Sequence, residues 1–356
     1  MNQRYKKQKE HGLFDEHFRM EAISKHGDPL ERLNAVINWD IFEPILQKTE
    51  NQHKKNNAGA KPYPPLLMFK ILILQRYYNL SDFQIEYQIL DRLSFGRFLG
   101  LSLKDKVPDE KTVWTFKERI TELSLEKDLF EEFRGKLEEN KLIVHEGKII
   151  DASFVEMPQQ RNKRDENKHI KETGTAPKEW ADKPNKMRQK DVDATWTQKG
   201  GQRHYGYKDH IKIDNKQKFI DTYCVTTAST HDSQALETLL DKKNDKGHDL
   251  YADSAYSGKN QDETISEYEI NNKVHERAYK NKPLTEEQKQ KNKEKSKVRA
   301  RVEHVFGLIE GSMNKFTLNC IGIKRATMTI GLINLTYNLF RYEQLVRLHG
   351  ITMSKF

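Results

Sequence analysis

Three acidic residues lie next to apolar residues, where burial of an unpaired carboxylate would be unfavourable. Asp151 and Asp253 each end a short apolar run that reads as a strand, and Glu303 lies in the helix-like segment 298–306. Burying a carboxylate beside apolar strand residues is unfavourable unless the group is paired or binds a cation. Several carboxylates at one site repel one another, and a hard divalent cation relieves that repulsion.

The chemistry that such a set could perform is phosphoryl transfer. Mg²⁺ is usually held by a few carboxylates together with substrate phosphates. Two such ions about 4 Å apart stabilise both the attacking and the leaving oxygen of an in-line displacement. The nucleophile is then water or a 3′-hydroxyl, and no side-chain nucleophile is needed.

Each carboxylate also has a simpler interpretation, because an Asp after a strand often starts a turn or caps a helix. Arg299 lies four residues before Glu303 and shares its helix face, so it could form an ion pair or bind a phosphate. Asp232 follows His231 where a helix begins, and an N-cap role is simpler there. The other rival carboxylates are Asp191, Asp193, Glu276 and Glu310.

The charge distribution favours a polyanionic partner. The chain has 356 residues, with 62 Lys and Arg against 53 Asp and Glu, so its formal net charge is +9. Segment 161–203 holds 12 basic and 7 acidic residues, and segment 273–299 holds 10 and 4. Concentrated positive charge suits nucleic acid, although lysine-rich solvated surface segments are the alternative.

Several function classes are excluded by what the sequence lacks. It contains neither a GxxxxGK[ST] phosphate loop nor an HExxH zinc motif. Cys224 and Cys320 are the only cysteines, which fits a reducing compartment and no zinc cluster. No run of eighteen apolar residues and no secretory h-region is present, so we expect a cytoplasmic protein.

The first 140 residues read as a helical domain. Helical periodicity covers 30–46 and 66–80, and a Ser-x-x-Gln capping box at Ser81 begins another helix. Asp109 begins one more, and this helix carries the candidate DNA contacts Lys111, Thr115 and Lys117. The region could form a helix-turn-helix that reads DNA, and a plain helical bundle is the alternative.

Residues 141–348 read as a mixed α/β domain with a central sheet. A strand hairpin is expected over 142–153, and a long, polar, lysine-rich loop over about 157–203. Further strands are expected at 205–213, 219–226, 249–253 and 273–276, and helices at 232–240, from 285 past 303 and at 327–348. The last helix would lie in the core or at an interface, and 349–356 would be a tail.

At these residues the sequence resembles the DDE transposases of bacterial insertion sequences, in the IS-four/IS-five superfamily. The similarity spans nearly the whole chain, and the order of the blocks makes it specific. The catalytic blocks are Ile150-Asp151-Ala152-Ser153, Tyr205-Gly206-Tyr207-Lys208-Asp209-His210, Thr230-His231-Asp232-Ser233-Gln234, Ala252-Asp253-Ser254-Ala255-Tyr256 and Arg299-Ala300-Arg301-Val302-Glu303. The N-terminal blocks include Lys61 to Leu67, Leu80-Ser81-Asp82 and Val107-Pro108-Asp109-Glu110-Lys111-Thr112.

The resemblance implies a ribonuclease-H-like fold in which Asp151, Asp253 and Glu303 bind two Mg²⁺ ions, with Mn²⁺ as a possible substitute. It implies cleavage and strand transfer at the terminal inverted repeats of a mobile element, by a homodimer on double-stranded DNA at the bacterial nucleoid. Arg299, Lys297 and Lys208 would be further DNA contacts.

Two positions depart from the superfamily signature, which has a tyrosine three residues before the arginine and a lysine seven residues after the glutamate. Here these are Ser296 and Glu310, and Lys315 is the candidate replacement for the lysine. Two alternatives stay open: a ribonuclease-H-like endonuclease that cuts without joining, and a sequence-specific DNA-binding protein that has lost catalysis.

Overall fold

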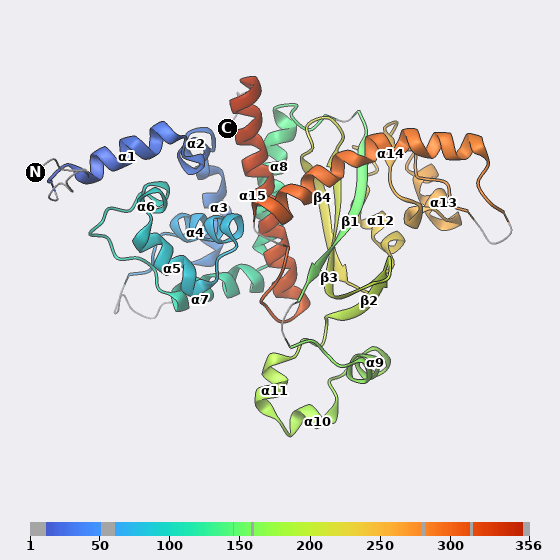
Figure 1. Cartoon of the computed structure of the whole chain (residues 1–356), viewed down its shortest axis with the longest axis horizontal. Coiled ribbons are helices and arrows are strands. Elements are labelled where there is room, and N and C mark those ends of the chain that lie inside the picture. The colour runs from blue at the N-terminus through green and yellow to red at the C-terminus, as the bar shows by residue number, and fades with distance from the viewer. Residues whose placement is uncertain are drawn as a thin grey trace, which may run out of the picture.

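A computed structural model of the chain describes residues 12–50, 61–144, 146–157, 160–278, 282–313 and 316–351. Its N-terminal helices gather on one side and its sheet with the later helices on the other, and the long helix α15 (Ile323–His349) lies between them (Figure 1). The N-terminal helices are α1 (Asp15–His26), α2 (Pro29–Val36), α3 (Glu43–Leu46), α4 (Pro65–Tyr78), α5 (Asp82–Asp91), α6 (Leu93–Leu99), α7 (Glu110–Glu122) and α8 (Leu125–Glu139).

Local sequence signals set most of these helix ends. The capping box at Ser81 and Gln84 begins α5, and the Asp109 carboxylate accepts the Thr112 N–H at the start of α7. The single helix expected over 30–46 is wrong. Its helix α2 ends at Val36, because Asn38 caps a new 3-10 turn that directs Trp39 into the core.

The sheet is mixed, and its strand order is β2-β3-β1-β5-β6, with β4 also paired to β3. Strand β1 pairs antiparallel with β3 and parallel with β5, and β5 pairs parallel with β6. This ribonuclease-H-like arrangement behind a helical region confirms the expected fold class. The strands are β1 (Lys148–Glu156), β2 (Thr195–Lys199), β3 (Gln202–Asp214), β4 (Ile220–Thr227), β5 (Asp249–Tyr251) and β6 (Asn271–Asn272).

The hairpin expected over 142–153 is wrong. Residues 142–144 form no strand, and the antiparallel partner of β1 is β3, which lies about 60 residues along the chain. Leu142 and Ile143 are apolar because they pack in the core after α8 ends, not because they alternate along a strand. Apolar runs of this length do not distinguish the two cases.

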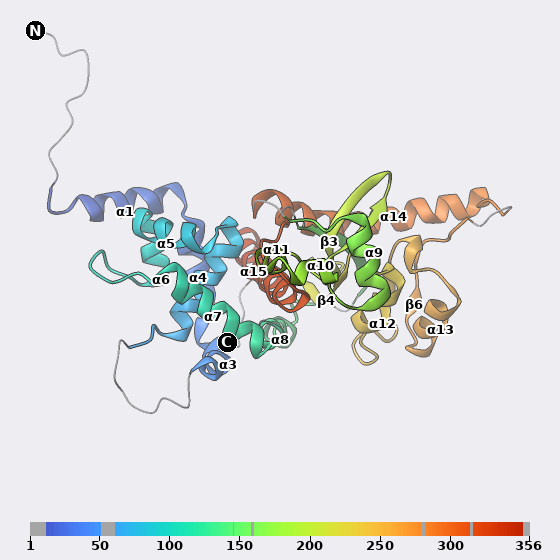
Figure 2. The same ribbon diagram turned by 90° about the horizontal axis from the view of Figure 1, so that it is seen from below.

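The irregular loop expected over about 157–203 is also wrong. It forms α9 (Arg164–Thr173), α10 (Lys178–Ala181) and α11 (Pro184–Gln189) and then β2, projecting from one end of the sheet (Figures 1 and 2). Its small core is buried Trp180, whose indole N–H donates to Glu166 at 3.0 Å. Lys186 also binds Glu166, and these partners hold the pKa of Glu166 at about 2 against the effect of burial.

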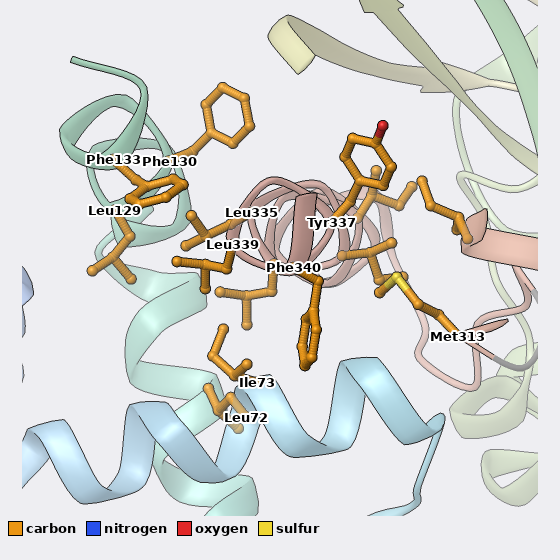
Figure 3. Close-up of a cluster of buried hydrophobic side chains, with 14 of the residues drawn as sticks. Leu72, Ile73, Leu129, Phe130, Phe133, Met313, Leu335, Tyr337, Leu339 and Phe340 are labelled. Carbon is orange, nitrogen blue, oxygen red and sulfur yellow. The ribbon is translucent and has the colours of Figure 1, made fainter. Parts of the chain in front are cut away.

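Helix α15 joins the two halves of the chain. Its residues Leu335, Leu339 and Phe340 pack between α4 and α8, as Figure 3 shows. The Phe340 ring stacks on Tyr77 of α4 at a centroid distance of 3.6 Å. Of the two places left open for this helix, the core and an interface, the structure shows the core. The division at residues 140 and 141 stays a prediction, because one hydrophobic cluster runs across it.

A buried ion-pair network also crosses this boundary. Asp221 of β4 binds Lys148 of β1 at 2.9 Å, Lys212 of β3 at 3.3 Å and Arg134 of α8 at 2.9 Å. Burial alone would raise the pKa of Asp221, but the three cations hold it well below its usual range. Removing the carboxylate would leave the buried Lys148 ammonium without its partner, which is strongly destabilising, whereas Lys212 would keep Asp245 and Arg134 would keep Glu138. No helix among the described residues is long and apolar enough to cross a membrane.

Asp209 of β3 is a second buried acid, and it has no cation. The Asn334 side-chain amide of α15 donates to its Oδ1 at 3.2 Å, while Asp209 Oδ2 and Asn334 Oδ1 are buried without a partner. Burial raises the pKa of Asp209 to about 8. A proton on the carboxyl would give it a donor for the amide oxygen, so the neutral acid fits this position better than the carboxylate.

Asp209→Asn should therefore stabilise the protein at high pH. The native pKa lies above the unfolded value, so the wild-type protein loses stability as the pH rises from about 4 to about 8. The variant lacks this loss, and each pH unit contributes at most about 1.4 kcal/mol. Urea unfolding across this pH range measures the difference, with Asp182→Asn at an exposed position as control. A variant less stable than wild type at pH 8 would show that the charged form is needed.

Candidate active site

The register of β1 and β5 brings Asp151 and Asp253 side by side. The parallel pairing matches Lys148 with Leu250 and Ile149 with Tyr251. Asp151 lies within β1 and Asp253 just after the end of β5, each two residues beyond the last matched pair. Adjacent strands lie about 4.8 Å apart, so the two carboxylates lie close together where β5 ends.

Asp151 is desolvated and only partly compensated. Its Oδ1 accepts the Ala152 N–H at 2.9 Å, and its Oδ2 accepts from Arg299 Nη1 at 3.0 Å. Burial raises the pKa of Asp151 to about 6, and Asp253 adds to the rise while Arg299 opposes it. A further positive charge near this carboxylate would therefore stabilise its ionised form.

Asp253 begins a 3-10 turn, Ser254–Tyr256, by accepting the Ala255 N–H at 2.8 Å. The capping interpretation of this residue is therefore correct, but it uses only one carboxylate oxygen. Oδ2 carries no hydrogen bond from any described residue. His275 lies close enough to feel both charges. Burial lowers the pKa of His275, the positive charge of Arg299 lowers it further, and the negative charge of Asp253 opposes this decrease.

Helix α14 (Glu286–Gly307) brings the third acidic residue to this region. Thr285 and Gln288 form the expected capping box at its start, and the helix packs against β1 and β5. Arg299 binds Asp151, so it does not form the i,i+4 pair with Glu303. Glu303 is exposed one turn further on, and beyond it Glu310 accepts from Ser153 Oγ at 3.1 Å. In the sequence, Glu303 therefore lies between two residues that contact β1, namely Arg299 and Glu310.

Asp151 and Asp253 fit a divalent cation by the chemistry of the pair. They are hard oxygen donors close to one another, and the charge of Asp253 opposes ionisation of Asp151. Among the residues that the structure describes, no three His, Cys, Asp or Glu side chains lie close enough to hold one ion. The structure thus brings the two aspartates together, and Glu303 lies on α14, where its side chain is exposed.

Lys208 and Asp232, which the sequence analysis named separately, meet in one polar cluster with His210. Lys208 Nζ donates to Asp232 at 2.7 Å and to the Thr230 carbonyl at 2.6 Å. His210 accepts from or donates to Thr226 Oγ1 at 2.8 Å. Asp232 is therefore an ion-pair partner and not an N-cap, a role that His231 fills. The blocks of the resemblance contain these residues, but only the fold shows that they meet.

Lys199 also belongs to this region and was missed. It lies at the end of β2, 3.7 Å from Asp232, and its charge lowers the pKa of Asp151. Its side chain is 53% exposed, so most of the ammonium group remains in solvent. A lysine in a polar hairpin gives no sequence signal for this position, because the fold of segment 157–203 was itself unknown.

The expected DNA contacts differ in accessibility. Lys111, Thr115 and Lys297 are exposed. Lys208 is buried in its pair with Asp232, and Lys117 binds Asp82 through both carboxylate oxygens. These two ammonium groups have protein partners, so neither is among the phosphate contacts that we propose below.

The remaining expected positions have structural roles or lie outside the described residues. Asp191 is buried and accepts from Tyr207 OH at 2.8 Å, and Asp193 accepts the Ile323 N–H at 2.8 Å. Ser296, where the signature has tyrosine, donates to the Asn292 carbonyl at 2.8 Å. Lys315 lies outside the described residues.

Comparison with known families identifies the chain. A family model described as Transposase DDE domain matches residues 144–339, and one described as Transposase domain (DUF772) matches residues 18–119. A solved piggyBac transposase synaptic complex with hairpin DNA is 11% identical, with 92% of this chain and 77% of that chain covered and a TM-score of 0.45. Because the first model covers more than half of the chain, this protein belongs to the DDE transposase family and is a DNA transposase.

Proposed function

We propose that this transposase cuts and joins DNA at the terminal inverted repeats of its own element, with Asp151, Asp253 and Glu303 as the catalytic residues. The observation that supports this most strongly is the β1–β5 register, which sets Asp151 opposite Asp253. The raised pKa of Asp151 supports it further, since perturbed carboxylates concentrate at functional sites.

In this proposal the two aspartates hold divalent metal, with Mg²⁺ as the physiological ion and Mn²⁺ as a substitute. Bound metal would supply Lewis-acid stabilisation of the charge on the attacking and leaving oxygens. Glu303 would complete the set from α14. Arg299 neutralises Asp151 through Nη1, while its Nε is buried without a partner, so the guanidinium has a donor left for a phosphate oxygen.

Binding of the DNA would rest on exposed cations around this edge. Lys297 on α14, two residues before Arg299, and Lys199 at the end of β2 are both exposed. Lys111 and Thr115 on α7 would contact the element ends. Contacts of lysines with phosphates give affinity that falls as salt rises. We further propose that two copies act together on paired DNA ends, at the bacterial nucleoid.

Replacing Asp151 or Asp253 by Ala should abolish DNA cleavage and joining while DNA binding persists. The loss should be at least about a thousandfold, because metal stabilisation of the transition state is worth several kcal/mol. The assay incubates purified protein with a labelled duplex carrying the element's terminal repeats and a target plasmid, with Mg²⁺ or with EDTA. Gel-shift binding in EDTA reports on the DNA complex.

Asp249→Ala is the matched control, because Asp249 begins strand β5 and its carboxylate accepts, among the described residues, only from Tyr251 OH at 3.1 Å. It should cut and join normally. Full activity in Asp253→Ala would refute the site. Cutting without joining by the wild-type protein would indicate an endonuclease, and specific binding without metal-dependent cutting would indicate a DNA-binding protein.

The third carboxylate can be tested by comparing Glu303→Gln with Glu310→Gln. We expect Glu303→Gln to lose cleavage as completely as Asp151→Ala, since it removes a charged oxygen ligand. Glu310→Gln should retain it, because the amide oxygen can still accept the bond from Ser153. Measuring cleavage rates and Mg²⁺ dependence of both variants decides the matter, and the reverse pattern would assign the role to Glu310.

A further inference from the structure

A cavity of about 500 Å³ lies where the N-terminal helices meet the start of α15. One wall comes from α4, α5 and α7 and includes Arg76, Asp82 and Trp114. The other wall comes from 317–329 and includes Asn319 and Arg325. The first group falls within the matched region 18–119 and the second within 144–339, so the cavity lies at the junction of the two family regions.

The charges in this cavity do not cancel. Lys117 binds both carboxylate oxygens of Asp82, one of them at 2.7 Å, and Gln75 also donates to Asp82 at 2.7 Å. Arg325 binds Glu118 through two hydrogen bonds of 2.7 and 2.6 Å. Asp82 and Glu118 are thus paired with Lys117 and Arg325, and the third cation of the cavity, Arg76, has no carboxylate partner.

Arg76 has no hydrogen bond or ion pair with any residue that the structure describes. Its side chain is half-buried, and burial lowers the pKa of the guanidinium while Cys320 and Asp82 oppose the fall. An arginine remains charged at any physiological pH, so a desolvated guanidinium without an anion is costly. Such a position is favourable when a ligand supplies the anion.

We propose that Arg76 binds a backbone phosphodiester of the transposon DNA in this cavity. A phosphodiester carries one negative charge, which would neutralise the one positive charge of Arg76 that no carboxylate of the cavity compensates. The guanidinium fork matches two phosphate oxygens. This inference rests on the proposed function, in that it takes DNA as the ligand, and it adds a contact at the junction between the two family regions.

The rim of the cavity is consistent with nucleic acid. Trp114 is 52% exposed, so an aromatic face is open to a sugar or base next to the bound phosphate. Trp114 lies on α7. Around the helix axis, the exposed residues Lys111 and Thr115 flank it on one side and Lys117 flanks it on the other. A strand bound at Arg76 would therefore continue along the helix that carries the candidate DNA contacts.

The test compares the salt dependence of DNA binding in wild type, Arg76→Gln and Arg76→Lys, using duplex DNA with the terminal repeats. Losing one phosphate contact should lower the slope of log K against log salt by about 1 and weaken binding to all sequences alike. Arg76→Lys should keep the slope, because it keeps the charge. Lys48→Gln is the control, since Lys48 pairs with Asp128 on a surface with Glu131 and Glu132 and should change nothing.

Thermal unfolding distinguishes a ligand contact from a structural one. Removing an unpaired, desolvated cation should leave Tm equal or higher in Arg76→Gln, and a lower Tm with an unchanged salt slope would overturn the proposal. Inorganic phosphate without DNA is a separate arm. If it raises Tm in wild type and not in Arg76→Gln while the DNA slope is unchanged, the site takes a free anion, and the DNA assignment is overturned.

The outcome is separable from that of the proposed function. An unchanged slope in Arg76→Gln, with cleavage still lost in Asp151→Ala, would remove this contact and leave the catalytic proposal intact. A reduced slope with cleavage still present at saturating protein would support a DNA contact that is not part of the chemistry.

Discussion

The parallel register between β1 and β5 is the constraint on which the candidate active site depends. Matching Ile149 with Tyr251 places Asp151 opposite Asp253, and a slip of one residue would turn one carboxylate to the opposite face. The strands pair over only two residue pairs, so the register needs support from outside the ladder. Asp221 holds β1 and β3 together by binding Lys148 and Lys212, and Lys212 also binds Asp245, which lies four residues before β5.

The remaining elements hold this strand pair against the rest of the chain. Arg134 extends the Asp221 network to α8, and α15 packs on α4, α8 and β4 together (Figure 3). The helical half is therefore not attached by a flexible linker but shares a core with the sheet. A rigid junction of this kind keeps a DNA contact on the helices at a fixed position relative to Asp151 and Asp253.

The sequence predicted the elements whose signals are local. Capping boxes at Ser81 and Thr285, apolar strands before Asp151 and Asp253, and the apolar α15 were all readable. The hairpin over 142–153 and the loop over 157–203 were wrong for one physical reason. Both depend on partners far along the chain, such as β3 for β1 and the Trp180–Glu166 contact for α9–α11, and periodicity does not report such partners.

The same limit explains why the sequence does not show which cations already have an acidic partner in the protein. Lys208 and Lys117 look like free cations in the sequence, yet each meets a carboxylate that only the fold brings near, Asp232 and Asp82. Arg76 lies in an apolar helical stretch, which predicts only a place in the bundle, yet it is left without an anion because Asp82 and Glu118 bind Lys117 and Arg325. A positive charge is available to DNA only after the protein's own acids have been assigned, and that assignment is a property of the tertiary structure.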